Sequence, residues 1–465
     1  CHIARAQEFF TNLNDKGLIE KQSEDRLYCS SCTAFLPDRY VAGTCPHCKS
    51  AAARGDQCEK CGTWYEPEEL VDPICQLCGV NKASIKPTTH WYFSLDKMQP
   101  QLEEWLNSKT DWRKSVLGYA FQPIKEGLSP RAITRDLDWG VPVPLPDAVG
   151  KVLYVWFDAP LGYISASEDW SVQQGEPDKW KSYWEDRDAK LVHFIGKDNI
   201  IFHTVVWPAV LMGDGRYVLP HLIAGNEFLN LEGEKFSTSR NYALWLSDVL
   251  DDVPVDCLRY YLTSISPETS DSNFSWADYQ TKINTELADI IGNLNNRVLS
   301  FINKNYAGQV VPKNPCCDLK VKAAIEEAYA AYCHDLDQAL TKGALGQIVA
   351  LGRTLNAYFQ EAAPWKVCKE DPAAAHQILH STACGIRVIA LMLYPVCPKI
   401  AQRMWQQLGY SGNISDERLP DALNLGFPPG HTLTAEIAPL VMKVEDEFVA
   451  EQRAKLEQQT VAALE

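Results

Sequence analysis

At 465 residues the chain is too long for a single hydrophobic core, so we expect roughly two to four domains. Hydrophobic residues make up 46% of the sequence, a globular composition that excludes an intrinsically disordered protein. The net charge of −16 argues against non-specific coating of nucleic acid, although it permits a local basic surface.

The cysteines and the lack of export signals indicate the compartment. Eight of the 16 cysteines form four CxxC pairs between residues 29 and 78, and the other eight are scattered. A disulfide framework is not expected in so long a chain without a signal peptide. The longest apolar stretch, residues 388–396, is too short to cross a bilayer. We therefore predict a cytoplasmic protein with no membrane contact, whose scattered cysteines are buried thiols.

The first third of the chain alternates between helical and extended segments. Apolar residues recur at helical spacing in residues 3–21, and Gly17 breaks this pattern near its end. Residues 24–88 are punctuated by glycine and proline and are too poor in apolar residues to fold on packing alone. Residues 89–145 combine a helix at 95–106 with extended segments.

Three strand-like runs follow, at residues 151–158, 190–195 and 217–225. A buried helix at 199–212 separates the last two, and this strand–helix–strand order predicts a parallel, doubly wound sheet. Ligands of such sheets bind beyond the carboxyl ends of the strands. The residues expected at those ends are Ala159, Pro160, Gly196, Lys197, Asp198 and Asn226.

From residue 274 onward the sequence is helical. Helical periodicity runs through residues 279–305, 319–332, 339–362 and 373–393, and prolines mark the joints. This pattern predicts a helix bundle. A charged amphipathic helix is expected at 443–464.

The CxxC pairs predict metal binding. They are Cys29/Cys32, Cys45/Cys48, Cys58/Cys61 and Cys75/Cys78. Two such corners supply four thiolates, the ligand set of a closed structural zinc site, and zinc then contributes folding free energy to a segment with little core. The alternatives are unliganded thiols or a redox pair, but a thioredoxin-type CxxC occurs singly at the start of a helix. The spacing allows both sequential and nested pairing of the corners.

Residues 233–240, which we call the Lys235 loop, carry the residue types of a phosphate-binding lid. Gly233 gives the backbone freedom, Lys235 and Arg240 carry positive charge, and Ser237 and Ser239 donate hydrogen bonds. The loop contains no GxxxxGK[ST] pattern, so it is not a P-loop.

The Lys235 loop resembles the KMSKS motif of class I aminoacyl-tRNA synthetases. Further stretches resemble the methionyl-tRNA synthetase family, and the match covers essentially the whole chain. They are residues 35–58 around the cysteine pairs, Tyr154-Val-Trp-Phe-Asp-Ala-Pro-Leu-Gly-Tyr163, His193-Phe-Ile-Gly-Lys-Asp-Asn-Ile-Ile-Phe-His203 and Glu361-Ala-Ala-Pro-Trp365. The resemblance implies an α/β class I fold with a Rossmann-like doubly wound parallel sheet, an inserted zinc-knuckle module and an all-α anticodon-binding bundle. It also favours nested pairing of the cysteines.

The resemblance implies five segments. Residues 1–23 and 89–225 belong to the catalytic domain, and residues 24–88 form the zinc-knuckle insertion. Residues 226–273 hold the Lys235 loop and a stem-contact region, and residues 274–465 form the anticodon-binding domain.

The resemblance also implies the reaction. Enzymes of the family use ATP with Mg²⁺ to convert methionine into methionyl-adenylate and pyrophosphate, and then transfer methionine to tRNA(Met) for translation initiation and elongation. Methionine, ATP and tRNA(Met) are the implied partners, and no covalent nucleophile is expected. Positioning and stabilisation of the charge on pyrophosphate carry such a reaction.

By resemblance, the methionine pocket falls on Trp156, Ala159, Pro160, Tyr163 and His203. A thioether is apolar and polarisable, and each contact with an aromatic ring is favourable by ~0.3–1.5 kcal/mol. The Tyr163 hydroxyl and a His203 nitrogen can also hydrogen-bond the sulfur, a weak acceptor. Ordinary core packing is the alternative for these side chains.

Nucleotide binding falls, by resemblance, on Gly196, Asp198, Lys235 and Thr238. Glycine permits close approach, and a carboxylate can accept the ribose hydroxyls; a simple turn is the alternative at residues 196–198. The catalytic residues implied in the loop are Lys235, Ser237, Ser239 and Arg240.

Two departures from the family pattern stand out. A HIGH-type motif is not present in this sequence, and the chain begins at Cys1 inside an expected helix, so we expect an N-terminally truncated chain that is not competent alone. The second lysine of the KMSKS motif is Thr238 here, which keeps a hydrogen-bond donor but lacks the charge. Arg240 can compensate for this loss.

Anticodon reading falls, by resemblance, on Asn293, Arg297 and Trp365. Residues four apart share one helix face, so Asn293 and Arg297 lie together, and unstacked bases are recognised by aromatic stacking and edge hydrogen bonds. A solvated Asn/Arg pair and a tryptophan that closes the bundle are the alternatives. The dimerisation domain of some family members is not in this sequence, which leaves the oligomeric state open.

Two other functions fit some of these features. Class I synthetases for cysteine, isoleucine, valine or leucine share the loop but typically lack this knuckle block joined to this pocket. A non-catalytic tRNA-binding paralogue is also consistent with Thr238 and with the missing HIGH motif.

Overall fold

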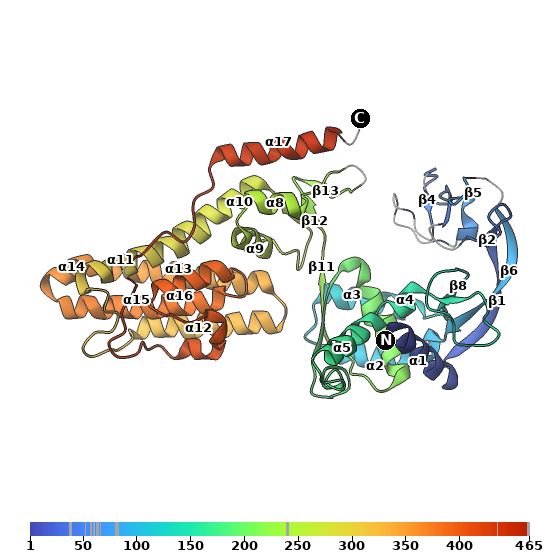
Figure 1. Cartoon of the computed structure of the whole chain (residues 1–465), viewed down its shortest axis with the longest axis horizontal. Helices are drawn as coiled ribbons and strands as arrows, with labels where there is room; N and C mark the ends of the chain where they lie inside the picture. The colour runs from blue at the N-terminus through green and yellow to red at the C-terminus, as the bar shows by residue number, and fades with distance from the viewer. Residues whose placement is uncertain are drawn as a thin grey trace. The chain divides into compact units, whose positions relative to one another are not determined.

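The computed structural model describes residues 1–462 apart from 37–39, 52, 56–57, 59–60, 62–64, 66, 80–82, 239–240 and 435, and it leaves out the side chains of residues 422, 461 and 462. The chain divides into two compact units, Cys1–Gly225 and Asn226–Glu465 (Figure 1).

The first unit opens with a helix and a long antiparallel ribbon. Helix α1 (His2–Asp15) buries Phe9, Phe10 and Leu13 and ends before Gly17, whose φ of +69° suits a helix terminus. The predicted helix over 3–21 is therefore too long, because strand β1 (Ile19–Cys29) begins directly after this turn. Strand β1 pairs with β6 (Ala83–Phe93) along its whole length. The two strands lead to and from the cysteine-rich segment.

The cysteine-rich segment contains only short strands. They are β2 (Ala34–Phe35), β3 (Val41–Thr44), β4 (Ala53–Arg54) and β5 (Val71–Cys75). Its small core includes Leu27, Val41 and Leu70 together with cysteines of the CxxC pairs. The core of this module is small and about half of its buried residues are not cysteines, which fits the expectation that metal binding contributes to its stability.

A helical pair and short strands lead into the α/β part. Helices α2 (Leu95–Asn107) and α3 (Lys114–Glu126) are followed by strands β7 (Arg131–Ala132), β8 (Thr134–Arg135) and β9 (Val152–Leu153). The expected strand over 151–158 is wrong beyond β9, because α4 (Val155–Asp158) is a helical turn in which the Asp158 N–H donates to the Tyr154 carbonyl (3.1 Å). A short apolar run does not distinguish a strand from a buried helical turn.

The strand–helix–strand unit lies where the sequence predicted it. Strands β10 (Leu191–Gly196) and β11 (Pro220–Asn226) are neighbours in a two-stranded sheet. The chain between them forms the 3₁₀ turn η3 (Lys197–Asn199), the π-helix η4 (Phe202–Val206) and helix α7 (Trp207–Asp214). Helices α5 (Leu161–Gln173) and α6 (Lys181–Trp184) precede β10. A π-helical segment within a buried helix frequently marks a functional site.

The second unit begins with a small sheet and two short helices. Strands β12 (Leu229–Leu231), β13 (Glu234–Lys235) and β14 (Ser272–Phe274) form one sheet, in the order β13-β12-β14. Helices α8 (Leu246–Asp252) and α9 (Val255–Ser264) lie between β13 and β14 in the sequence.

Helices dominate the rest of the unit, as predicted. The segments α10 (Trp276–Lys282), η5 (Ile283–Gly292) and α11 (Asn293–Tyr306) follow one another without a break. The others are α12 (Leu319–Asp337), α13 (Thr341–Ala362), α14 (Pro364–Glu370), α15 (Pro372–Leu393), α16 (Pro398–Gln407) and α17 (Asp446–Ala462). Short 3₁₀ turns occur at Pro67–Glu69, Ile414–Asp416 and Leu419–Leu423.

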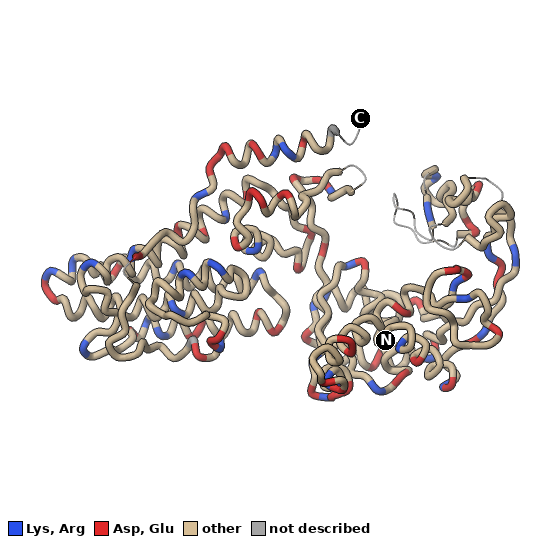
Figure 2. Tube along the Cα trace, viewed as in Figure 1, with Lys and Arg blue, Asp and Glu red and all other residues tan. Residues whose placement is uncertain are grey.

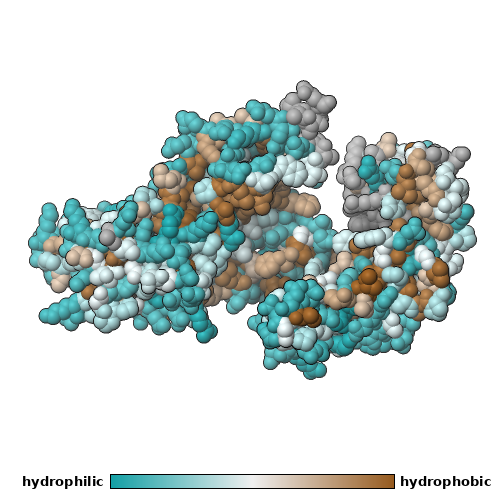
Figure 3. Space-filling model, in the orientation of Figure 1, coloured by the Kyte–Doolittle hydropathy of each residue, from teal (hydrophilic) through white to brown (hydrophobic). Residues whose placement is uncertain are grey.

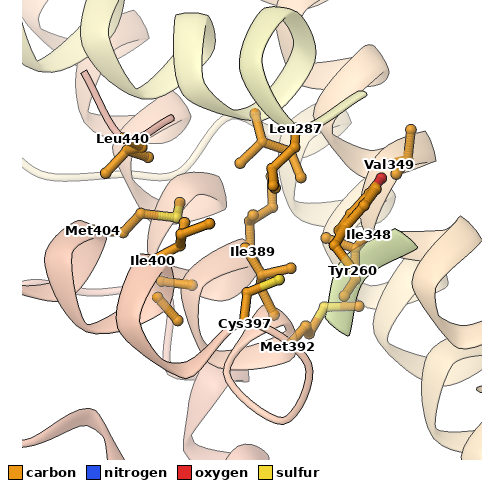
Figure 4. Close-up of a cluster of buried hydrophobic side chains, with 14 of the residues drawn as sticks. Tyr260, Leu287, Ile348, Val349, Ile389, Met392, Cys397, Ile400, Met404 and Leu440 are labelled. Atoms are coloured by element: carbon orange, nitrogen blue, oxygen red, sulfur yellow. The ribbon is translucent and has the colours of Figure 1, made fainter. Parts of the chain in front are cut away.

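One continuous core runs through the second unit. Tyr260 of α9, Leu287 of η5 and Ile389 of α15 are buried in it together with residues of α13 and α16 (Figure 4). The outer face of the bundle is largely hydrophilic in the view of Figure 3. Among the described residues, none of the helices combines the length and the apolar character needed to cross a membrane.

Candidate functional site

Three predicted pocket residues come together in the first unit. The Tyr163 hydroxyl of α5 lies 3.1 Å from the Nε2 of His203 in η4. The Trp156 ring of α4 lies 5.1 Å from the Phe202 ring, and Phe202 in turn contacts the His203 ring at 5.4 Å. Trp156 and Tyr163 are 41% and 42% exposed, so both rings remain accessible to a ligand.

The hydrogen bonds of His203 fix where its proton lies. Its Nδ1 is 3.0 Å from the Asn199 carbonyl oxygen, which can only accept, so Nδ1 carries the proton. Burial lowers the pKa of His203, which keeps the ring neutral at pH 7. The unprotonated Nε2 therefore accepts from the Tyr163 hydroxyl. The Tyr163 hydroxyl proton is donated to His203, and the His203 Nδ1 proton is donated to the Asn199 carbonyl oxygen. Neither side chain can therefore donate to a methionine sulfur without breaking one of these hydrogen bonds.

His193 is a residue that the sequence reasoning did not assign to the site. It lies on the buried side of β10, with its ring 5.4 Å from Tyr163 and 5.1 Å from His203. Burial, with the neighbouring His203, lowers the pKa of His193 to about 4. Its Nε2 is buried and has no hydrogen-bond partner among the described residues. The run Leu191–Gly196 is apolar on both faces apart from His193, so the sequence gives no signal of which face is buried.

The other two predicted pocket residues lie at the junction of α4 and α5. Ala159 is exposed, whereas Pro160 is buried and precedes the first turn of α5. Proline suits this place because the first residues of a helix have no intrahelical partner for their N–H groups. The two residues therefore lie at a helix junction and not beyond a strand end, as the sequence had suggested.

Gly196 and Asp198 follow the carboxyl end of β10. A Cβ atom on Gly196 would lie 2.6 Å from the Asp198 carboxylate, so a larger residue here would displace this side chain. Asp198 is exposed on the 3₁₀ turn η3. The structure thus leaves a carboxylate accessible at the edge of the sheet where the sequence predicted ligand binding.

A cavity of about 820 Å³ lies elsewhere in the first unit, between the β1–β6 ribbon and the segment after β7. In its wall the Arg135 guanidinium lies 3.5 Å from the Tyr154 ring centroid. Burial alone would raise the pKa of Asp136, but hydrogen bonds from His90, Lys151 and Thr88 hold it below its usual value. The predicted pocket residues do not line this cavity, which the sequence reasoning did not anticipate.

The eight paired cysteines form two groups of four. One holds Cys29, Cys32, Cys75 and Cys78, and the other holds Cys45, Cys48, Cys58 and Cys61, with all sulfurs of a group within 4.8 Å of one another. The nested pairing is confirmed, and the sequential pairing is wrong. Sulfur separations of 3.6–4.0 Å fit the ~3.8 Å edge of a tetrahedron with Zn–S bonds of about 2.3 Å. The donor sets therefore fit structural zinc.

The Lys235 loop lies in the second unit. Lys235 is exposed, and its ammonium lies 6.0 Å from the Phe228 ring centroid. Ser237 and Tyr242 form an antiparallel bridge in which their backbone groups bond at 2.8 and 2.9 Å, with Thr238 inside the bridged segment. Ser239 and Arg240 lie outside the described residues.

The predicted anticodon residues lie on helices α11 and α14. Asn293 is exposed at the start of α11, and Arg297 follows one turn later. The Arg297 guanidinium lies 5.2 Å from the Phe359 ring and 6.0 Å from the Trp365 ring, and it donates to the Gln360 side chain at 3.3 Å. Stacked arginine and exposed polar edges are the chemistry that unpaired bases require.

Comparison with known proteins decides the family. A profile described as "tRNA synthetases class I (M)" matches residues 1–299, and "Anticodon binding domain of methionyl tRNA ligase" matches residues 313–460. The chain belongs to the methionyl-tRNA synthetase family. The methionine–tRNA ligase of Rubrobacter xylanophilus is 41% identical, over 98% of this chain and 80% of the relative.

Further members of the methionyl-tRNA synthetase family align over nearly the whole chain. The ligases of Chlorobaculum tepidum and Methanopyrus kandleri are each 40% identical over 98% and 99% of this chain, which spans 67% of either relative. A solved Mycobacterium tuberculosis methionyl-tRNA synthetase in complex with methionyl-adenylate matches with a TM-score of 0.73 at 26% identity, over 94% of this chain and 80% of that one.

Membership of the methionyl-tRNA synthetase family confirms the predicted fold class, an α/β class I synthetase part followed by a helical anticodon domain. It contradicts the alternative that the chain is a class I synthetase for cysteine, isoleucine, valine or leucine.

Proposed function

We propose that this chain is a methionine–tRNA ligase that acts in the cytoplasm, with its methionine pocket at Trp156, Tyr163 and His203. The observation that carries the proposal is the hydrogen-bonded Tyr163–His203 pair beside the Trp156–Phe202 ring contact, in a chain with about 40% identity to methionine–tRNA ligases along its length. The reaction joins methionine to the adenylyl group of ATP, which releases pyrophosphate, and then transfers methionine from the adenylate to tRNA(Met), which releases AMP.

The pocket selects methionine through ring contacts more than through hydrogen bonds. Because Tyr163 donates to His203 and His203 donates to Asn199, the pair holds two rings in place as walls. A thioether gains ~0.3–1.5 kcal/mol from each aromatic contact, which a methylene of the same shape lacks. Ala159 and Pro160 at the α4–α5 junction complete the proposed pocket.

Activation needs no nucleophile from the protein. The methionine carboxylate attacks the α-phosphorus of ATP in line; a carboxyl O–P bond forms, the bond from the α-phosphorus to the bridging oxygen breaks, and pyrophosphate leaves with the electron pair. Gly196 and Asp198 are proposed to hold the adenosine. Lys235, Ser237, Thr238, Ser239 and Arg240 are proposed to hold the phosphates. Mg²⁺ accompanies ATP as part of the substrate.

The positive charge of the Lys235 loop determines how much the loop contributes to the activation of methionine. Lys235 supplies one charge to the departing pyrophosphate, and Thr238 supplies only a hydrogen bond. We therefore assign the second charge to Arg240. In the intact enzyme, with the HIGH-containing half present, Arg240→Ala should slow methionine-dependent pyrophosphate exchange strongly, with Arg240→Lys as the matched variant that keeps the charge. Unchanged exchange in Arg240→Ala would refute this role.

The helix bundle is proposed to read the anticodon. Trp365 and the Arg297 guanidinium offer stacking surfaces, and Asn293 offers edge hydrogen bonds to the CAU bases. The two four-cysteine groups are proposed to hold structural zinc, which stabilises the module between β1 and β6.

Binding measurements test the proposal directly. Equilibrium dialysis should show that the protein binds methionine and discriminates against leucine and isoleucine, and that His203→Ala weakens methionine binding. A stem–loop with a CAU anticodon should bind, and one with a changed anticodon should bind more weakly. Equal binding of the three amino acids, or methionine binding unaffected in His203→Ala, contradicts the proposed pocket.

A further inference from the structure

Helix α17 contacts both ends of the Lys235 loop. Gln459 of α17 and Asn241, the residue directly after the loop, are 218 positions apart in the sequence and are joined by hydrogen bonds. Arg453 of the same helix contacts Glu232, the residue directly before the loop. The resemblance to the family assigned this helix no role.

The first end of the loop is a tight turn held from two sides. Glu232 and Gly233 have φ values of +44° and +89°, as a two-residue hairpin turn between β12 and β13 requires. The left-handed conformation is unfavourable for a residue with a side chain, so Glu232 depends on its contacts. Its carboxylate accepts from the Trp276 backbone N–H at 2.8 Å and from the Arg453 guanidinium at 3.1 Å.

The second end is held by a reciprocal pair of bonds. The Gln459 side-chain amide donates to the Asn241 carbonyl oxygen (3.2 Å) and to the Ala243 carbonyl oxygen. The Asn241 side-chain amide donates in return to the Gln459 carbonyl oxygen at 3.2 Å. Asn241 also has a positive φ of +50°, and its side-chain oxygen accepts from the Trp245 ring N–H at 2.8 Å.

Helix α17 is itself packed against other elements of the second unit, so it can hold these contacts in place. Val449, Gln452 and Leu456 are buried, and the Phe448 ring meets the Trp276 ring edge-on at 5.8 Å. Lys455 bonds Asp252 of α8 at 2.8 Å. The helix carries both acidic and basic residues along its length (Figure 2). The bonds to the loop therefore connect it to a packed element of the same unit.

We propose that α17 is a clamp that fixes the two ends of the Lys235 loop, with Gln459 and Arg453 as positioning residues. The inference rests on the proposed function for the role of Lys235 in holding ATP phosphates. Fixing both ends before ATP arrives reduces the conformational freedom that the loop loses on binding, and so increases affinity for ATP. Methionine binding, which uses the first unit, does not depend on this clamp.

Amide hydrogen exchange on the full protein without ligand tests the clamp. Gln459→Ala should accelerate exchange at the Tyr242 amide, which donates to the Ser237 carbonyl oxygen at 2.8 Å, by about tenfold. The matched control is Gln458→Ala, which alters an exposed neighbour on the same helix. Arg453→Ala should instead accelerate the Gly233 amide, which donates to the Asn273 side chain at 2.7 Å.

Ligand affinities separate positioning from general destabilisation. In Gln459→Ala the Kd for ATP should rise several-fold, while the Kd for methionine and the melting temperature stay at the wild-type values. Wild-type exchange at Tyr242 in Gln459→Ala, equal acceleration in Gln458→Ala, or an unchanged Kd for ATP would overturn the clamp. If the wild-type protein binds neither ATP nor methionine, the proposed function fails, and the exchange rates alone still decide whether α17 holds the loop.

Discussion

His193 should make the stability of the first unit depend on pH in a way that one substitution removes. Burial beside His203 lowers the pKa of His193 to about 4, from an ordinary value of 6.5. Between about pH 4 and pH 6.5 the folded state therefore binds fewer protons at His193 than the unfolded state does. This contribution to stability is fully present above about pH 6.5 and is lost as the pH falls toward 4.

The size of the effect follows from the two pKa values. Their difference is about 2.5, and each pH unit is worth about 1.4 kcal/mol, so the full contribution is about 3 kcal/mol. The side chain is 7% exposed, so solvent screens this contribution little. His193→Leu replaces the imidazole by an apolar side chain of similar size and removes the titration.

The assay compares wild type with His193→Leu by urea unfolding at several pH values between 7.5 and 4. Exchange of amides in β10 and α7 reports the first unit alone. The variant should gain about 3 kcal/mol relative to wild type as the pH falls, because losses at the cysteine groups are common to both proteins. Parallel stability curves for the two proteins would refute the reasoning, since they would mean that His193 is not a buried neutral ring.

Three further predictions concern the hydrogen-bonded pair, the metal groups and the bundle. Tyr163→Phe leaves the buried His203 Nε2 without its donor and should lower the unfolding free energy by about 1 kcal/mol in urea unfolding; no loss would show that the bond is not formed. Cys75→Ser should reduce bound zinc from two ions to one per chain by elemental analysis, whereas Cys316→Ser, outside both groups, should leave two; equal zinc in both variants would contradict a zinc site that includes Cys75. Gly385→Ala places a Cβ 2.5 Å from the buried Leu355 side chain and should destabilise the bundle by about 1–3 kcal/mol. Gly346→Ala, with open space around it, should stabilise the bundle by about 0.5–1 kcal/mol. Shifts of the melting temperature in the same direction in the two variants would count against this packing.

Residues close together in the sequence were sufficient to predict several features of this protein. The CxxC corners predict zinc because two thiolates three residues apart can bind one ion in any fold, and the helices of the second unit follow from apolar spacing and proline joints. The Lys235 loop was proposed from its glycine, lysine and serines, because phosphate binding depends on residue types that lie close in sequence, and its role stays a prediction. The roles of Ser239 and Arg240, and the five segment boundaries, stay predictions.

Tertiary structure decided whatever depends on contacts between distant residues. The spacing of the cysteines allowed two pairings, and only the return of β6 along β1 brings Cys75 and Cys78 to Cys29 and Cys32. Residues 155–158 form a helical turn because backbone bonds to Tyr154 and Val155 close there, which an apolar run does not reveal. The neutral ring of His193 and the bonds from α17 to the residues that flank the Lys235 loop arise from burial and proximity between segments remote in the sequence. The sequence by itself thus determined which chemical groups the protein carries, and the tertiary structure decided which of them meet, because hydrogen bonds and desolvation act over a few ångströms of space whatever the separation along the chain.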